Sequence, residues 1–371
     1  MRIAVVHSNA DYLLGLRLPL LRHLRERFEV VAMAPRLRAA HLEDLAALGI
    51  EGADFSLQPT GLNPLTDLVD TARLARNLRR LRLDAILTNT IKPVTLGTFA
   101  AALAGIPRRY ALISGLGFAF MDDEEPAGIR KRVVRVVATA QYRAALALNR
   151  RVVFHNPDDM RFFVEAGICR ADRAGYVDGS GVDTVAFAQA PPVSEPVFVA
   201  VSRLLRDKGI GEYLEAARMV KSRIPEASFL LVGDVDPNPS SLDRREVQRY
   251  VEDGTIHWAG AVTDVRPWLR RAAVFVLPSY REGIPRSTLE AMATGRAVVT
   301  TDVSGCRETV IEGTNGLLVP ARNAAALADA MATLAVQPDR VREMGIASRR
   351  IAEERFDVAV VHRRLDELIG W

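Results

Sequence analysis

The sequence is poor in cysteine: Cys169 and Cys306 are the only two in 371 residues, and they do not form a Cys-x-x-Cys motif. This scarcity argues against a disulfide framework and a thiolate zinc site, and it is typical of proteins in a reducing compartment. The six histidines show neither His-x-x-x-His nor His-Glu-x-x-His spacing, which disfavours a histidine metal site. We therefore expect neither a resident metal nor another cofactor.

Long apolar runs and aromatic residues are also scarce. No run approaches the roughly 20 apolar residues that a membrane-spanning helix needs. The apolar run in the N-terminal stretch MRIAVVHSNADYLLGL is too short for a signal peptide, and the stretch is predicted to begin with a β-strand. Aromatic residues make up 6% of the chain, and no recognition motif is present, so no nucleic-acid partner is expected. These features favour a cytoplasmic protein that is at most peripheral to a membrane.

Short apolar runs instead alternate with helical patterns along the whole chain. The runs are hydrophobic on both faces, as buried parallel strands are, which predicts an α/β fold with doubly wound sheets. Strands are predicted at residues 2–8, 29–35, 53–57, 84–89, 109–114 and 152–156, and again at 197–204, 229–234, 255–261, 274–279, 297–302 and 316–320. Helices are predicted near 13–26, 37–48, 64–80, 94–104, 128–149 and 158–166, between the later strands, and over 338–355 and 358–369.

A break in this rhythm divides the chain. The stretch GYVDGSGVDTVAFAQAPPVSEP, residues 175–196, is rich in Gly and Pro and is predicted to be a linker. The linker predicts two Rossmann-like domains, residues 1–185 and 186–356. A C-terminal helix is predicted over 357–371 and could pack back on the first domain. Ligands of such sheets bind outside the C-terminal strand ends, so two facing domains would enclose a deep cleft. Neither first strand is followed by the Gly-x-Gly-x-x-Gly of a dinucleotide enzyme.

The stretch SYREGIPRSTLEAMATG places two glutamates around a helix start. Glu282 lies in the predicted loop, Pro285 suits the first helical position, and Gly295 suits the C-terminal cap. Glu290 then lies inside the helix, about 10 Å from Glu282. A helix N-terminus attracts phosphate, and an acid on either side would bind hydroxyl groups, as a nucleotide sugar requires. The separation disfavours a retaining glycosidase, whose carboxyl groups lie about 5–5.5 Å apart.

Two cations follow the first strand of the second half. In AVSRLLRDKGI, Arg203 and Lys208 come between a strand and a helix, where they suit a diphosphate and would do the work of a metal ion. A surface turn with solvated cations is the alternative for this stretch alone. Asp234 and Asp236 in GDVD leave open a metal-binding Asp-x-Asp site with Mn²⁺ or Mg²⁺.

Together these segments carry a family resemblance. The order VSRLLRDKG, LVGD, WAGA, VLPSYREGIPRSTLEAMATGRAVVTTDVSGCRE, NGLLVP resembles the retaining GT-B glycosyltransferases of family four. The stretches LLGLRLPLLRHL, NTIKPVTLGTFAAALAGIPRRYALISGLGFAF, VVFHNPDD and GSGVDTVAF resemble, more loosely, a bacterial branch that builds surface glycans on undecaprenyl diphosphate. That branch includes the diacetylbacillosaminyl-diphospho-undecaprenol N-acetylgalactosaminyltransferases.

The resemblance implies roles for individual residues. Arg203 and Lys208 would bind the diphosphate, Glu282 the donor sugar and Glu290 the ribose, and the first three would be the catalytic set. Backbone N–H groups from Gly283 to Arg286 would contact sugar and phosphate, and the turn at Val262 would bracket the base. The implied donor-binding set is Arg203, Lys208, Val262, Glu282, Gly283, Ile284, Pro285, Arg286 and Glu290.

The acceptor side is less well defined. His7 ends the first strand, and Arg17 and Lys92 lie at predicted helix starts, where they could bind an acceptor diphosphate. A structural histidine and two solvated cations are the alternatives. Many family members carry a histidine near the reacting carbon, but ISGLG offers Ser114 and Gly115 at that place, so the group that polarises the acceptor stays open.

A basic helix is predicted over 128–151. Residues 1–190 hold 25 Lys/Arg against 20 Asp/Glu, and Gly128–Arg151 has seven Lys/Arg and no acid. An apolar stripe runs along it at helical spacing: Ile129, Val133, Val136, Val137, Ala140, Ala144 and Leu148. The helix either packs this stripe on its sheet or rests its basic face on anionic lipid.

The resulting hypothesis is a retaining, metal-independent transferase. It would move a hexose or N-acetylhexosamine from a nucleotide sugar, expected to be UDP-linked, to a polyprenyl-diphosphate-linked sugar at the inner face of the cytoplasmic membrane. A nonhydrolysing nucleotide-sugar epimerase, a phosphorylase of the same architecture and a non-catalytic sugar-nucleotide binding protein are the alternatives.

Overall fold

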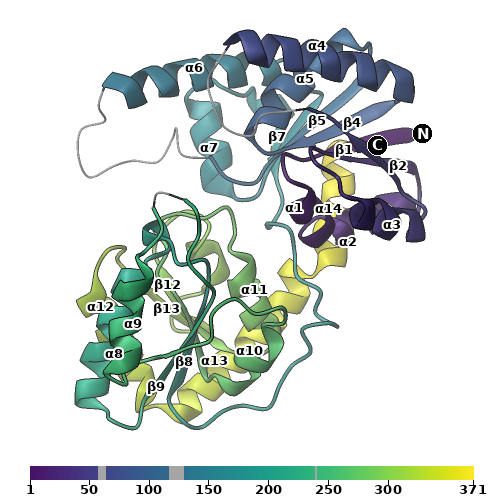
Figure 1. Cartoon of the computed structure of the whole chain (residues 1–371). Helices are drawn as coiled ribbons and strands as arrows, with labels where there is room; N and C mark the ends of the chain where they lie inside the picture. Colours follow the sequence, from purple (N-terminus) through teal and green to yellow (C-terminus); the bar gives the residue numbers. More distant parts are fainter. Residues whose placement is uncertain (57–63, 117–128, 239) are drawn as a thin grey trace. The chain divides into compact units, whose positions relative to one another are not determined.

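A computed structural model describes the chain except for residues 57–63, 117–128 and 239. The described residues divide into two compact units, Met1–Ser180 with His362–Trp371, and Gly181–Val361 (Figure 1). The C-terminal residues therefore belong to the same unit as the N-terminal half of the chain. Each unit is built around its own parallel sheet.

The first unit contains a seven-stranded parallel sheet in the order β3-β2-β1-β4-β5-β6-β7. Every residue of β4 is buried, as the two-sided apolar pattern of a parallel strand predicts. The strands are β1 (Arg2–Val6), β2 (Glu29–Ala34), β3 (Glu51–Asp54), β4 (Ala85–Asn89), β5 (Arg108–Ile113), β6 (Arg151–Phe154) and β7 (Ala174–Tyr176).

Helices cover both faces of this sheet. One apolar cluster joins alternate residues of β1, β2 and β4 to α4 and α5, and Figure 1 shows α1, α2 and α14 on the opposite face. The helices are α1 (Ala10–Gly15), α2 (Leu18–Arg25), α3 (Ala39–Ala47), α4 (Pro64–Leu81), α5 (Thr98–Leu103), α6 (Ile129–Leu146), α7 (Pro157–Glu165) and the end of α14 (Val358–Ile369).

The second unit contains a six-stranded parallel sheet in the order β10-β9-β8-β11-β12-β13. Two apolar clusters, one on each face, fill it. Its strands are β8 (Val197–Val201), β9 (Ser228–Val232), β10 (His257–Trp258), β11 (Val274–Leu277), β12 (Ala297–Thr301) and β13 (Gly316–Val319). Its helices are α8 (Ile210–Arg223), α9 (Arg244–Glu252), α10 (Arg266–Arg271), α11 (Arg286–Ala293), α12 (Ala324–Ala335) and α13 (Pro338–Ile351).

Three local predictions were wrong. The helix expected over 13–26 is two helices, α1 and α2, because Pro19 cannot continue a helix through its own position and instead lies in the first turn of the second. The stretch expected to begin the linker contains β7, which is too short to show a strand pattern. Pro285 is the N-terminal cap of α11, and Arg286 is its first residue.

The basic helix α6 exposes the valines of its apolar stripe. Val133, Val136 and Val137 are 55%, 68% and 39% exposed, whereas Tyr142 and Leu146 on another side of the helix are buried in an apolar cluster of the first unit. The stripe is therefore not the packed face, and the residues that do pack lie between its members. Neither α6 nor any other helix among the described residues is long and apolar enough to cross a membrane.

Candidate active site

The loops after β8 and β11 form the centre of the candidate site. These strands are neighbours in the middle of the second sheet, where the strand order reverses. Ligands of open parallel sheets bind at such a switch point, beyond the carboxyl ends of the strands. The loop after β8 carries Arg203 and Lys208, and the loop after β11 carries Glu282. The fold thus brings together the two segments that the sequence singled out.

Lys208 and Glu282 form an ion pair across these loops. Lys208 Nζ lies 2.5 Å from Glu282 Oε1, and the side chains are only 20% and 13% exposed. The buried hydroxyl of Ser279 donates to the same oxygen at 2.9 Å. Among the described residues no group hydrogen-bonds to Glu282 Oε2. The carboxylate is thus fixed through one oxygen and offers the other as an acceptor for a ligand hydroxyl.

Two glycines allow these loops to come so close. Gly209 has φ +67°, and a Cβ there would lie 2.0 Å from the carbonyl oxygen of Pro278. Gly305 has φ +83°, and a Cβ there would lie 2.3 Å from the carbonyl oxygen of Glu282. Cys306, next to Gly305, is buried, and burial together with the nearby Glu282 carboxylate raises the pKa of its thiol to about 12. That thiol stays protonated and supplies no nucleophile.

Helix α11 begins directly after the Glu282 loop and offers unpaired backbone donors. The N–H groups of Arg286 and Ser287 in its first turn, and of Ile284 in the preceding loop, donate to no acceptor in the described part of the chain. They suit an anionic ligand. Glu290 lies further along the helix, is 8% exposed, and accepts from Arg286 Nε at 2.8 Å. Burial raises the pKa of Glu290, and Arg286 partly offsets that rise.

Arg203 is bound to an acid of the suspected metal motif. Its guanidinium group lies 3.0 Å from Asp236 Oδ2, and Arg244 lies 2.5 Å from Asp234 Oδ1. A hydrogen bond from the Asn238 backbone and the contact with Arg203 lower the pKa of Asp236. Each acid of the Asp-x-Asp pair is thus engaged by an arginine. Among the described residues no group of three or more His, Cys, Asp or Glu is arranged to hold a metal ion.

Val262, which is predicted to contact the nucleotide base, lies in the second unit. Val262 is half-buried and packs against the apolar cluster that includes Leu277 and Ile284. It follows β10, at the carboxyl edge of the sheet. Its role toward a base remains a prediction.

The predicted acceptor residues lie in the first unit, and the structure shows two of them buried. His7 is 5% exposed and Arg17 is 3% exposed. Arg17 contacts His155 Nε2 at 3.3 Å and donates to Ser180 Oγ at 3.2 Å. Burial and the charge of Arg17 lower the pKa of His7 to about 4 and that of His155 well below its ordinary value. Both imidazoles are therefore neutral at pH 7, and Arg17 lies within the protein interior.

The other three acceptor residues differ in their surroundings. Lys92 Nζ lies 2.8 Å from Asp67 Oδ1, and both side chains are largely buried. Ser114 and Gly115 follow β5 and are half-exposed, with φ +154° at Gly115. An acceptor role for any of the five stays a prediction, and for Lys92 it requires that the ion pair with Asp67 be broken or shared.

Ser279 and Gly305 were not predicted from the sequence. Both lie within the motifs that carry the family resemblance, but a serine at a strand end and a glycine in a loop have many other uses. Only the fold shows that Ser279 binds the Glu282 carboxylate and that Gly305 packs under its backbone.

Comparison with known proteins identifies the family of the chain. A family model described as "Glycosyl transferases group 1" matches residues 195–337. The N,N'-diacetylbacillosaminyl-diphospho-undecaprenol alpha-1,3-N-acetylgalactosaminyltransferase of Campylobacter jejuni is 30% identical over 349 residues, which cover 90% of this chain and 89% of the relative. The UDP-Gal:alpha-D-GlcNAc-diphosphoundecaprenol alpha-1,3-galactosyltransferase of Escherichia coli is 26% identical and covers 93% and 96% of the two chains.

Solved structures show the same fold. HepE of Anabaena, crystallised with UDP-glucose, superposes with a TM-score of 0.77 at 20% identity and covers 100% of this chain and 99% of that one. The resemblance expected from the motifs and the two-sheet α/β architecture are thereby confirmed. The chain belongs to the group 1 glycosyltransferases and has the GT-B fold.

Proposed function

We propose that this glycosyltransferase moves a hexose or N-acetylhexosamine from a UDP-sugar to a sugar carried on polyprenyl diphosphate, with retention and without a metal ion. Both full-length relatives are named for transfer to undecaprenyl-diphosphate-linked sugars. One of them, and the HepE complex, is named with a UDP-sugar donor. The observation that carries the proposal is the Lys208–Glu282 pair beside the unpaired N–H groups of α11.

The second unit would bind the donor. Lys208 and Arg203 would neutralise the diphosphate as it departs, supported by the N–H groups of α11. Glu282 Oε2 would accept a hydroxyl of the donor sugar, and Glu290 would bind the ribose. The two cations thereby supply the positive charge that a divalent ion supplies in a metal-dependent transferase.

Retention would follow from attack on the face from which the diphosphate leaves. The bond between the anomeric carbon and the diphosphate oxygen breaks, and the acceptor oxygen bonds to the same face of that carbon. The acceptor proton passes to the departing phosphate, so no protein base is required. This mechanism is taken from the family resemblance.

Peripheral attachment to the inner face of the cytoplasmic membrane completes the proposal. A lipid-linked acceptor must be reached at the headgroup plane. The exposed valines of α6 and the exposed Arg132 and Arg143 on the same acid-free helix suit an anionic lipid surface.

The test is a UDP-release screen of several UDP-sugars with a lipid-linked acceptor extract, with and without EDTA. We expect acceptor-dependent release with one donor, unchanged by EDTA, and a product of unchanged anomeric configuration by NMR. Loss on chelation that Mn²⁺ restores would overturn metal independence. Interconversion of UDP-sugars without transfer would favour an epimerase, and binding without turnover would favour a non-catalytic protein.

A further inference from the structure

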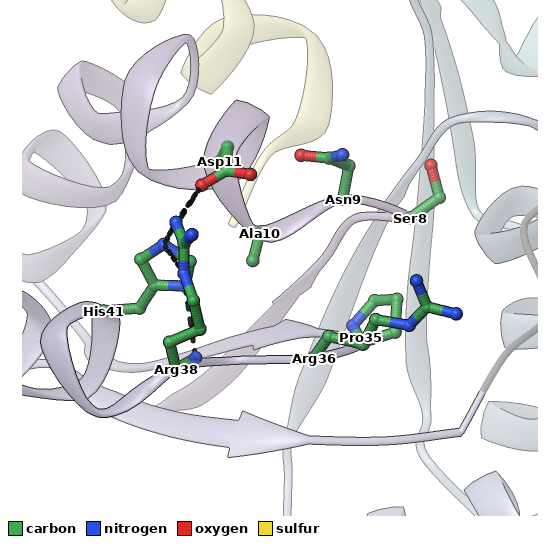
Figure 2. Close-up of a pocket in the computed structure, with 8 residues that line it drawn as sticks. All are labelled: Ser8, Asn9, Ala10, Asp11, Pro35, Arg36, Arg38 and His41. Carbon is green, nitrogen blue, oxygen red and sulfur yellow. Dashed lines mark hydrogen bonds and ion pairs between the residues drawn. The ribbon is translucent and has the colours of Figure 1, made fainter. Parts of the chain in front are cut away.

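A pocket in the first unit lies outside every residue discussed so far as an acceptor ligand. It opens at the carboxyl ends of β1 and β2 and has a volume of about 300 Å³, at the small end of the range for ligand sites. Figure 2 shows Arg38 and His41 on one side and Ser8 and Arg36 on the other. The lining residues are Ser8, Asn9, Ala10, Asp11, Pro35, Arg36, Arg38 and His41.

Arg36 is held in an unusual backbone conformation at this pocket. Its φ is +60°, which few residues other than glycine adopt. The carboxylate of Asp54 accepts its backbone N–H at 3.0 Å and helps to fix that conformation. No described carboxylate lies within ion-pair distance of the Arg36 guanidinium group, so its donors face solvent and the pocket.

The charges of the pocket partly cancel. Arg38 lies 2.5 Å from Asp11 Oδ1, and His41 Nε2 lies 3.1 Å from the same oxygen. The lining thus carries two guanidinium groups, Arg36 and Arg38, and one carboxylate, Asp11, while the Asp54 carboxylate lies outside the lining on the Arg36 backbone. A diphosphate would meet little net positive charge here. A neutral ligand with many hydroxyl groups would find both donors and acceptors, and Pro35 and Ala10 supply apolar surface.

Ser8 of the lining contacts the switch point of the first sheet, between β1 and β4, through Thr90. Thr90 Oγ1 donates to Ser8 Oγ at 2.8 Å, and Thr90 has φ +72°, a strained value for a β-branched residue. Asn89, just before it, is 1% exposed, and neither the nitrogen nor the oxygen of its side-chain amide has a hydrogen-bond partner in the described part of the chain. Buried amides are nearly always paired, so an unpaired one beside strained backbone marks a place for a bound molecule.

We propose that this pocket is a carbohydrate subsite that binds a neutral sugar ring of the acceptor, with Arg36 and Ser8 as hydrogen-bonding groups. The assignment rests on the proposed function, since the acceptor there is a lipid-linked sugar. It assigns acceptor recognition to the loops at the carboxyl ends of β1 and β2. Lys92 is instead paired with Asp67, and Arg17 is buried.

The first test measures binding without turnover. Saturation-transfer NMR with the methyl glycosides of N-acetylglucosamine, N-acetylgalactosamine and glucose is run on wild type, Arg36→Ala and Arg82→Ala. Arg82 is a matched control, because it is an exposed arginine of the same unit and also has a positive φ, +49°. It precedes β4 and so lies at the amino ends of the strands, away from the pocket. We expect Arg36→Ala to abolish the saturation transfer of at least one glycoside and Arg82→Ala to leave it unchanged. Binding of inorganic diphosphate, but of no glycoside, in an Arg36-dependent way would overturn the sugar assignment.

The second test uses turnover with the lipid-linked acceptor. Loss of a hydrogen bond from a charged group predicts that Arg36→Ala raises the KM for acceptor about tenfold or more, with the KM for the UDP-sugar unchanged. Wild-type acceptor KM in a folded Arg36→Ala protein would overturn the subsite and leave the transferase proposal intact. If no acceptor is used at all, the transferase proposal fails, and glycoside binding alone decides the subsite.

Discussion

Lys208 Nζ and Glu282 Oε1 lie 2.5 Å apart, so the two charged groups expected to bind the diphosphate and the sugar of a donor bind each other in the structure. Ser279 shares the same carboxylate oxygen. The pair fixes both side chains at the switch point. A diphosphate that approaches Lys208 would compete for its protons and leave Glu282 free to turn toward the sugar.

Lys208→Ala should remove a charge-assisted contact with the departing diphosphate. One such donor contributes about 2–4 kcal/mol to the transition state, so kcat should fall about 30- to 10³-fold while the protein stays folded. Steady-state kinetics with circular dichroism as the folding check measure this. Lys221→Ala, in α8 and hydrogen-bonded to the Ala227 carbonyl, is the control. Wild-type turnover of Lys208→Ala would contradict the assignment.

Ser279→Ala should loosen Glu282 without removing it. The remaining bond to Lys208 leaves the carboxylate free to rotate, and a lost hydrogen bond of about 1 kcal/mol predicts a kcat about fivefold lower. Donor KM should change less than kcat if the hydroxyl acts by positioning. Ser222→Ala, which removes an exposed hydroxyl bonded within α8, should have no effect. An unchanged kcat for Ser279→Ala would show that Lys208 alone orients the glutamate.

Asp236→Asn should strengthen donor binding. The substitution removes the negative charge of Asp236, from which the Arg203 guanidinium group must separate before it binds a diphosphate. An exposed ion pair is worth about 0.2–1 kcal/mol, so donor KM should fall by up to about fivefold. Asp329→Asn, which removes the exposed pair with Arg223, should leave donor KM unchanged. A loss of activity in Asp236→Asn would instead revive the metal-binding interpretation of this acid.

The buried histidines predict a loss of stability at mildly acid pH. The folded-state pKa of His7 is about 4, below its ordinary 6.5, and that of His155 is also lowered. The unfolded chain therefore takes up protons first as pH falls, so stability is full above pH 6.5 and declines toward pH 4, by about 3 kcal/mol at most for His7.

This decline can be measured in the first unit alone. Trp371 lies in that unit, and Trp258→Phe with Trp268→Phe makes it the sole tryptophan. Urea unfolding followed by Trp371 fluorescence should show the decline between pH 6.5 and 4. His7→Asn with His155→Gln should flatten it. If the urea midpoint of the variant that keeps both histidines does not change with pH, these imidazoles are not held neutral.

The donor segments could be predicted from sequence because their signals are local. A strand, a short loop and a helix start with particular charges identify Lys208 and Glu282 without tertiary information. The pairing of these two residues was not predictable, because it depends on β8 and β11 being neighbours. Arg17 shows the same limit, since its position at a helix start predicts exposure, but the packing around His155 buries it.

Helix α6 shows a different limit. Its apolar stripe has the periodicity of a packed face, and periodicity does not reveal which side of a helix meets the protein. The structure places Tyr142 and Leu146 inward and the valines outward. Exposed valines on a helix without acids are typical of a surface that meets lipid.

The valines therefore give the sharpest test of membrane attachment. Val133→Ser, Val136→Ser and Val137→Ser together remove apolar surface that would insert among acyl chains and retain every cation of α6. Partial burial of three valines contributes about 2–3 kcal/mol, so binding to anionic vesicles should weaken about 30- to 150-fold in sedimentation assays. The exposed Val336→Ser in the second unit is the control. Turnover with a water-soluble acceptor analogue should survive, because the donor site is untouched. If the triple variant sediments like wild type at both low and high salt, the valine face does not contact lipid, and the exposed stripe must be assigned to a protein partner.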